Sequence, residues 1–318
     1  MSIGVIYFAT GNRYLDEAAR SAASVKQFHP DLSITLFTDR PFVSTLFDNV
    51  ITVPSGQHPL VHQLMCIGQS PYDITLSLDT DTFVCAPLGN LFDLMERFDM
   101  ASTFVPRRHR EQDIELMAAV MRPLPESVVQ LSPGFLLYKK SPVVSAMLAE
   151  WLRLYERDMA RARSAQHSSP VYQGISQQLS MLEALYYSSV RFFTLPNEYN
   201  CVFMLPGFLG EPVRVLHGRH PDLPHIAECL NAVAGPRVHT LIGYTMTVTG
   251  RNGERRKFQT LGTAAILNEY RQDLRDSVER RGIRGSLPYF ALRLNRFRSR
   301  FAAHFKSNVL RRDRAPHE

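Results

Sequence analysis

Three apolar runs in the first part of the chain each lead into a short polar stretch, and this repeated pattern constrains the fold more than any other feature. The runs are residues 3–9 (IGVIYFA), 34–39 (ITLFTD) and 73–84 (DITLSLDTDTFV), and a stretch with helical apolar spacing, 14–27, lies between the first two. Continuous apolar strands that alternate with helices are typical of a mostly parallel sheet covered on both faces. The sequence therefore predicts an α/β fold with a single Rossmann-like, mixed but mostly parallel sheet flanked by helices.

Further elements extend this pattern to about residue 265. We expect strands at 50–53, 100–105, 134–138 and 213–216, helices at 91–97, 141–163 and 173–187, and a hairpin over 244–260. We expect the hairpin turn at Arg251-Asn252-Gly253, because Asn-Gly is the strongest short-range hairpin signal. These elements predict one domain over 1–265, followed by a basic helical tail over 266–318.

Composition excludes several classes of protein. No apolar run approaches the ~20 residues that span a bilayer, and we expect residues 3–9 to be a core strand rather than a signal peptide. The four cysteines lack C-x-x-C spacing, which favours buried thiols in a reducing compartment over disulfides or a zinc site. From Arg271 onward there are 13 basic and 5 acidic residues, which leaves 23 basic and 25 acidic in 1–270. The positive charge therefore belongs to the tail, which argues against a nucleic-acid-binding body.

Asp79 and Asp81 follow a predicted buried strand, with one residue between them. Ligands of open α/β sheets bind beyond the carboxyl ends of the strands, and alternate side chains of extended backbone point the same way. Two carboxylates placed so suit a hard divalent cation that also binds a substrate phosphate. The alternative is an ordinary acidic turn, since D-x-D alone is a weak motif.

Seven segments in order carry a resemblance to the glycosyltransferase A-type fold, in the branch of glycogenin and the bacterial lipopolysaccharide galactosyltransferases. They span residues 5–220 and read VIYFATGNRYLDEA, ITLFTD, SPYDITLSLDTDTFV, SPGFLLYKKSP, GISQQLSMLEALYYS, LPNEYN and VLHGRH. The resemblance implies a metal-dependent hexosyltransferase that uses a nucleotide-diphosphate sugar, with uracil as the base and retention at the anomeric carbon. It implies Asp79, Asp81 and His217 as ligands of Mn²⁺ or Mg²⁺, and a neutral imidazole suits Mn²⁺.

The resemblance also implies a set of donor-binding residues. Ala9, Thr10 and Asn12 correspond to the loop that receives the base and ribose, Gly134 corresponds to a position of close approach to the donor sugar, and Gly218 is a further candidate. The remaining candidates are Tyr14, Asp39, Arg219 and His220. Their alternatives stay open: a plain strand-to-helix turn for the first loop, a core position for Tyr14 and a helix cap for Asp39. Arg219 is suited to a diphosphate by its planar fork.

Three places in the sequence depart from the family pattern. Gln177-Gln178 stands where relatives have Asp-Gln, so the implied catalytic set is Gln178, Gln177 and Asp81. An amide can bind hydroxyl groups but cannot accept a proton, and this puts specificity and turnover in doubt. His62 lies where relatives often carry Lys in the helix before the acidic motif. Serine and proline also precede Gly134 in place of the family's asparagine and small residue.

The tail contains a basic amphipathic pattern over 288–310. Phe290, Leu294, Phe297, Phe301 and Phe305 recur at helical spacing, with arginines largely off that stripe. Such a helix suits an anionic membrane surface. The alternative, to which we give equal weight, is that its apolar stripe packs on the domain or on a partner.

We therefore expect a cytoplasmic enzyme, peripheral at the inner face of a membrane, that transfers a sugar to a glycan, lipid-linked or protein acceptor. A degenerate relative that binds nucleotide sugar without turnover is the second hypothesis, supported by Gln177. A nucleic-acid binder that uses the aromatic and basic tail is the third, although no recognised DNA or RNA motif is present.

Overall fold

A computed structural model describes residues 1–54, 58–105, 121–125, 127–166, 177–262 and 275. The chain divides into two compact units. The first comprises Met1–Val202 and Val213–Leu223, and the second Phe203–Pro212 and Pro224–Glu318. The boundary expected at 265/266 and the amphipathic pattern over 288–310 lie outside the described residues and stay predictions.

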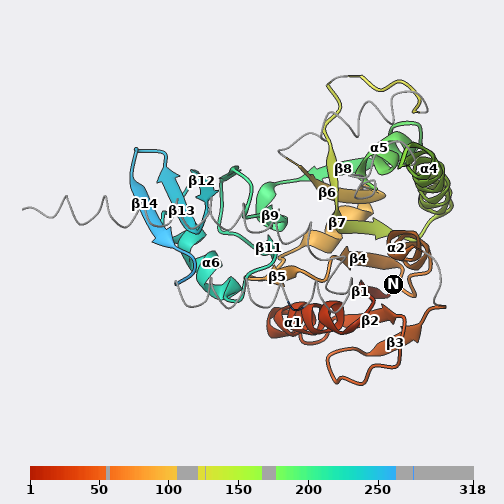
Figure 1. Cartoon of the computed structure of the whole chain (residues 1–318), viewed down its shortest axis with the longest axis horizontal. Helices are drawn as coiled ribbons and strands as arrows, with labels where there is room; N and C mark the ends of the chain where they lie inside the picture. Colours follow the sequence, from red (N-terminus) through yellow and green to blue (C-terminus); the bar gives the residue numbers. More distant parts are fainter. Residues whose placement is uncertain (55–57, 106–120, 126, 167–176, 263–274, 276–318) are drawn as a thin grey trace, which may run out of the picture. The chain divides into compact units, whose positions relative to one another are not determined.

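The first unit is built on a seven-stranded sheet. Its strands are β1 (Ile3–Ala9), β2 (Ser33–Thr38), β3 (Asn49–Thr52), β4 (Ile74–Leu78), β6 (Met100–Phe104), β7 (Leu131–Lys139) and β8 (Phe192–Leu195). The strand order is β3-β2-β1-β4-β7-β6-β8 (Figure 1). The first four are mutually parallel, β7 runs antiparallel to β4 and β6, and β8 is parallel to β6. The predicted mixed, mostly parallel sheet is confirmed.

Helices cover both faces of this sheet. They are α1 (Asn12–Phe28), α2 (Pro59–Gly68), the 3-10 turn η1 (Leu91–Glu96), α4 (Pro142–Gln166), α5 (Gln178–Tyr186) and the 3-10 turn η2 (Asn197–Tyr199). The helix expected from Ser141 begins there, because the Val144 amide donates to Ser141 Oγ at 3.3 Å and Pro142 occupies the first turn.

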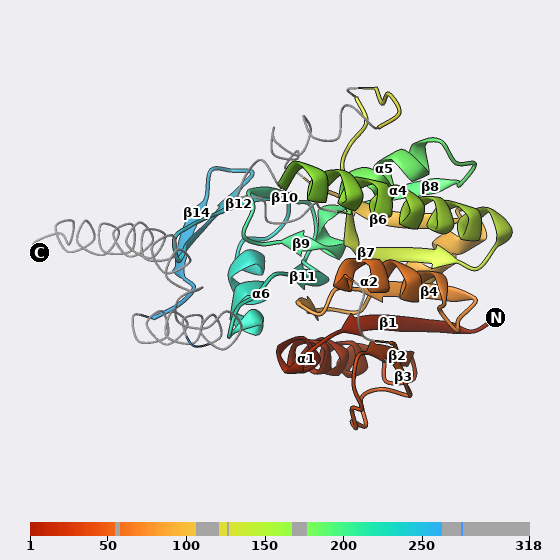
Figure 2. The same cartoon turned by 45° about the vertical axis from the view of Figure 1, so that its right-hand side comes forward.

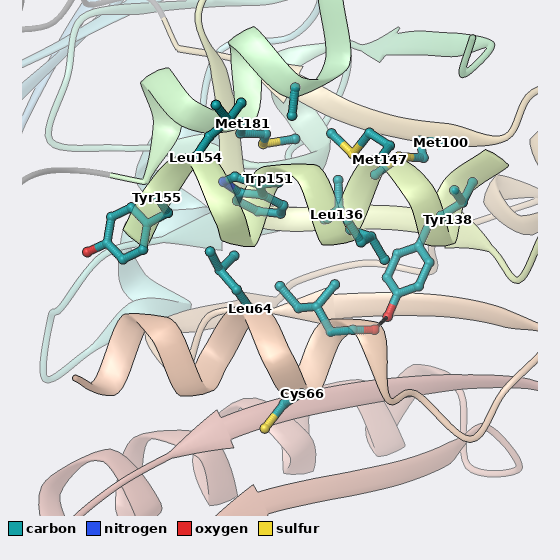
Figure 3. Packing of buried hydrophobic residues seen from close by; sticks show 14 of the residues in the cluster. Leu64, Cys66, Met100, Leu136, Tyr138, Met147, Trp151, Leu154, Tyr155 and Met181 are labelled. Atoms are coloured by element: carbon teal, nitrogen blue, oxygen red, sulfur yellow. Dashed lines mark hydrogen bonds between the residues drawn. The ribbon is translucent and has the colours of Figure 1, made fainter. Parts of the chain in front are cut away.

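Alternation along the strands divides the interior into two cores. On β7, Leu136 and Tyr138 face one core, and Phe135 and Leu137 face the other. The first core is completed by α2, α4 and α5, which lie together over the sheet (Figure 2), and the second by α1 and η1. Trp151 of α4 is fully buried in the first core, among the side chains drawn in Figure 3. A strand buried on both faces needs the continuous apolar runs seen in the sequence.

Two smaller sheets accompany the single sheet that was expected. The first unit also contains β5 (Thr82–Val84), β9 (Cys201–Val202) and β11 (Val215–His217), in the order β5-β11-β9. The second unit contains β10 (Gly207–Leu209), β12 (Arg237–Ile242), β13 (Thr245–Gly250) and β14 (Arg255–Gln259), in that order, and most of α6 (Leu223–Asn231). The hairpin predicted at 244–260 is confirmed, and Gly253 adopts a φ of 80° in its turn.

All four thiols are free, as expected. Cys66, Cys201 and Cys229 are buried, and Cys85 is partly exposed. Burial raises the pKa of Cys66 to about 12, which keeps this thiol protonated and unreactive at neutral pH. None of the helices in the described part of the chain has the length and hydropathy that crossing a bilayer requires.

Truncating Leu136 tests the first core. Leu136 is 0% exposed, so Leu136→Ala leaves a cavity and is expected to lower the free energy of unfolding by about 2–5 kcal/mol. Val43→Ala, at a side chain that is 97% exposed, serves as control and should change it by less than about 0.5 kcal/mol. Urea denaturation measures both, and equal midpoints for the two variants would contradict the packing described.

Candidate functional site

A tight turn at the end of β4 presents Asp79 and Asp81. All five residues of β4 are buried, and the chain turns directly after the strand ends. The Asp79 amide donates to the Gly134 carbonyl on β7 at 2.9 Å, and the Thr82 amide donates back to the Asp79 carbonyl at 3.2 Å. Backbone hydrogen bonds on both sides therefore fix the two carboxylates at the carboxyl edge of the parallel strands.

The short sheet brings His217 to the same place. β11 pairs antiparallel with β5, with His217 opposite Thr82, and the Gly218 amide donates to the Asp81 carbonyl at 2.9 Å. His217 Nε2 lies 3.6 Å from Asp79 Oδ2 and 3.3 Å from Asp81 Oδ1. One ligand atom from each of the three side chains falls within 4.8 Å of the others. We refer to Asp79, Asp81 and His217 as the acidic triad.

The donor atoms of the acidic triad suit a divalent cation. Two carboxylate oxygens and one imidazole nitrogen match the preference of Mn²⁺, and Mg²⁺ would accept the oxygens more readily than the nitrogen. Gly134 provides the space that this group needs. A Cβ at position 134 would lie 2.4 Å from His217 Cε1 and 2.6 Å from Asp79 Oδ2. Only glycine therefore lets β7 pass this close to the side chains of both His217 and Asp79.

Asn200 fixes the orientation of the His217 ring. Asn200 Nδ2 donates to Thr103 Oγ1 and Ser132 Oγ, both at 2.9 Å, which leaves its Oδ1 as an acceptor 2.9 Å from His217 Nδ1. The imidazole therefore carries a hydrogen on Nδ1 and turns Nε2 toward the two carboxylates. A hydrogen-bonded partner of this kind is typical of metal-binding histidines.

Charge and burial shift the pKa values of the acidic triad in different directions. Burial raises the pKa of Asp79, and the nearby Asp81 charge adds to this. Burial also opposes ionisation of Asp81, but the hydrogen bond to His217 and the charges of His217 and Arg219 lower its pKa to about 2. Burial alone would lower the pKa of His217, and its hydrogen bond to Asp81 and the two carboxylate charges raise it instead. The raised pKa values of Asp79 and His217 both favour a proton held in the triad, which a cation would have to displace.

Arg219 adds a permanent positive charge beside the acidic triad. Its Nη1 lies 3.1 Å from Asp81 Oδ2, and its Nε and Nη2 donate to the Glu17 carboxylate at 2.8 and 3.0 Å. The guanidinium also lies 5.6 Å from the centre of the Tyr14 ring, which is 39% exposed rather than in the core. Glu17 therefore holds the planar fork of Arg219 in place from α1.

The predicted base and ribose residues lie at the ends of the neighbouring strands β1 and β2. Ala9 pairs with Thr38 in the parallel ladder, so both strands end at the edge where β4 ends. Gly11 has a φ of 78° and donates its amide to Asp39 Oδ1 at 3.2 Å, and Arg40 Nη1 donates to Asn12 Oδ1 at 3.1 Å. Thr10 is partly exposed within the same turn. Asp39 thus organises this loop rather than capping a helix.

The remaining predicted residues have separate surroundings. Gln178 accepts a hydrogen bond from Gln130 at 2.5 Å, and Gln177 directly precedes α5 with its Nε2 3.3 Å from Gln63 Oε1. The His220 ring is buried, with Nδ1 2.8 Å from the Asp222 carbonyl oxygen. The ligand roles proposed for these residues stay predictions.

Three neighbours of the site were missed by reasoning from the sequence. Gln63 Nε2 donates to Asp79 Oδ1 at 2.9 Å, whereas the adjacent His62, which drew attention in the sequence, packs against the ring of Phe8. Glu17 and Asn200 are the other two. Asn200 ends the segment LPNEYN and Glu17 lies in the segment VIYFATGNRYLDEA, both of which carry part of the resemblance, whereas no sequence signal marks Gln63.

Substituting Gly134 tests the close approach of β7. Gly134→Ala places a methyl group against His217 and Asp79, so we expect Mn²⁺ affinity to fall by at least about tenfold, as for disturbed neighbours of metal ligands. Gly68→Ala, where a Cβ meets nothing within 4 Å, is the matched control. Isothermal titration of Mn²⁺ into both variants measures the effect, and equal affinities would contradict it.

The raised pKa of His217 predicts that metal binding releases a proton. Below this raised pKa the imidazole is protonated, so Mn²⁺ must displace a proton and its apparent affinity falls as pH falls. Above it, binding should no longer depend on pH through this group. Titration calorimetry in two buffers of different ionisation enthalpy measures the protons released. Equal heats in both buffers at pH 6 would show that His217 is already neutral.

Comparison with known proteins adds the following findings. No protein-family model and no curated protein sequence matches the chain. It is similar to the solved structure of the galactosyltransferase LgtC in complex with donor and acceptor sugar analogs, at 15% identity over 69% of this chain and 87% of that one, with a TM-score of 0.44. It is also similar to mouse xyloside xylosyltransferase 1, at 13% identity over 69% of this chain and 98% of that one, with a TM-score of 0.42. The bifunctional glycosyltransferase WbbM is similar at 15% identity over 63% of this chain and 39% of that one, with a TM-score of 0.37. All three of these proteins are glycosyltransferases.

Proposed function

We propose that this protein is a metal-dependent glycosyltransferase that binds a uridine-diphosphate sugar and transfers the sugar to an acceptor hydroxyl. The observation that carries the proposal is the acidic triad, whose ligand atoms lie within 4.8 Å at the carboxyl edge of parallel strands. This edge is where ligands of open α/β sheets bind. The resemblance of seven sequence segments supplies the uridine donor and the hexose.

In this proposal the residues divide the work by their chemistry. Asp79, Asp81 and His217 hold Mn²⁺ or Mg²⁺, which supplies positive charge to a diphosphate leaving group. Arg219 lies beside Asp81 and adds a second positive charge toward the diphosphate. Ala9, Thr10, Asn12, Tyr14 and Asp39 form the loop for the base and ribose.

The transfer step forms one bond and breaks one. The acceptor hydroxyl oxygen bonds to the anomeric carbon, the bond from that carbon to the β-phosphate oxygen breaks, and the hydroxyl proton leaves with the diphosphate or with water. Gln178 and Gln177 are proposed to bind hydroxyl groups near the anomeric carbon, since their amides cannot accept a proton. Retention of configuration, a glycan, lipid-linked or protein acceptor and a peripheral membrane position belong to the same proposal.

Removal of one carboxylate provides the test. Isothermal titration should detect UDP binding in the presence of Mn²⁺ and lose it with EDTA. Asp81→Asn keeps the size of the side chain but removes a charge and a good ligand, so we expect UDP affinity to fall at least about tenfold. Asp31→Asn, at an exposed aspartate, is the matched control and should bind as the wild type does.

The outcomes separate the proposal from its alternative. Manganese-dependent UDP binding with release of UDP from a UDP-sugar supports a transferase, and the anomeric configuration of the product then reports retention. The same binding without turnover supports the alternative, a nucleotide-sugar-binding protein, which Gln177 in place of the family's aspartate favours. Absence of UDP binding under any condition would rule out the uridine donor.

A further inference from the structure

Two glutamine side chains connect the start of α5 to the acidic triad. Gln177 Nε2 donates to Gln63 Oε1 at 3.3 Å, and Gln63 Nε2 donates to Asp79 Oδ1 at 2.9 Å. The three residues come from separate elements: Gln177 precedes α5, Gln63 lies on α2 and Asp79 follows β4. We refer to Gln177, Gln63 and Asp79 as the amide relay.

The chemistry of the groups fixes the direction of the amide relay. An ionised carboxylate only accepts hydrogen bonds, so Gln63 must turn its NH₂ group to Asp79 and its carbonyl oxygen to Gln177. Gln177 must then turn its own NH₂ group to Gln63. Its Oε1 is consequently left buried, with no hydrogen-bond partner among the residues that the structure describes. A buried acceptor without a partner costs free energy, which indicates that Asp79 imposes this orientation.

The core holds both glutamines of the amide relay in place. Gln177 is 6% and Gln63 is 9% exposed, so bulk water cannot readily replace either contact. The Gln177 carbonyl oxygen accepts hydrogen bonds from Trp151 Nε1 and Ser180 Oγ, both at 3.0 Å. Trp151 is fully buried in the core drawn in Figure 3. The backbone of Gln177 is therefore anchored independently of its side chain.

From these contacts we infer that Gln63 is a positioning residue for the metal ligand Asp79 and that Gln177 holds the Gln63 amide in the required orientation. This inference rests on the proposed function. Gln63 occupies Asp79 Oδ1, so the other oxygen, Oδ2, is the one presented toward His217 Nε2 at 3.6 Å. The two neutral amides of the relay thus orient the carboxylate without competing with a cation for charge.

Titration of Mn²⁺ alone into the full chain tests the role of Gln63. Gln63→Met keeps a side chain of similar length but removes the donor, and the Kd for Mn²⁺ should rise by about tenfold to 100-fold. Gln63→Asn, whose amide is too short to make both contacts, should show a similar loss and covers the case in which the methionine variant fails to fold. Gln130→Met is the matched control, because Gln130 is also 9% exposed but bonds to Gln178 instead.

A double-mutant cycle tests the role of Gln177. Gln177→Met alone should raise the Kd by about threefold, because Gln63 remains but its orientation is no longer fixed. In the Gln63→Met background the same change should have no further effect. Additive losses would show that Gln177 acts on the ion by another route and would overturn the relay.

The wild type separates failure of this inference from failure of the proposed function. If the wild type binds no Mn²⁺, this result contradicts both the proposed function and the role of the amide relay. If the wild type binds Mn²⁺ and Gln63→Met binds it with the same Kd, the relay alone is overturned. A loss in Gln63→Met and Gln63→Asn with none in Gln130→Met, together with a non-additive cycle, supports it.

Discussion

Repulsion between the carboxylates of Asp79 and Asp81 is the constraint around which the site is arranged. Both follow a buried strand, where water screens their charges less than at an open surface. His217 approaches both carboxylates and Arg219 approaches Asp81, so a permanent positive charge stands beside Asp81 and the His217 ring, positive when protonated, stands beside both. The pKa shifts of the two carboxyl groups differ because burial raises the pKa of Asp79, whereas at Asp81 the hydrogen bond and charge of His217, together with the charge of Arg219, outweigh burial.

The small sheet matters as much to the site as the large one. The seven-stranded sheet fixes the end of β4, but His217 comes from a strand of three residues that pairs with β5. That pairing begins at Thr82, directly after the acidic turn, and continues into the bond from the Gly218 amide to the Asp81 carbonyl. Backbone hydrogen bonds therefore hold His217 at the carboxylates, and Gly134 on the other side leaves room for its ring.

Sequence reasoning succeeded where one local pattern decides the structure and failed where distant polar contacts decide it. The strand before Asp79 and the hairpin turn at Gly253 were predictable from apolar runs and from Asn-Gly. β12 was missed because Arg237 and His239 make it look polar, although they are 2% and 1% exposed. Arg237 donates hydrogen bonds to several backbone carbonyl oxygens, and no local sequence pattern reveals that its charge is paired in this way. Gln63 was missed for the same reason, because only the fold shows that it meets Asp79.

The neutrality of the two glutamines fits the charge balance of the site. Asp79, Asp81 and Glu17 carry three negative charges when ionised, and Arg219 and Arg13, which both pair with Glu17, carry two positive charges. With a neutral imidazole this group keeps one negative charge, so a divalent cation would leave it with one positive charge beside the proposed diphosphate. A carboxylate or an ammonium group at position 63 would disturb that balance next to the ligand it has to orient. An amide can donate to Asp79 with no such effect. This gives a physical reason for uncharged side chains at positions 63 and 177.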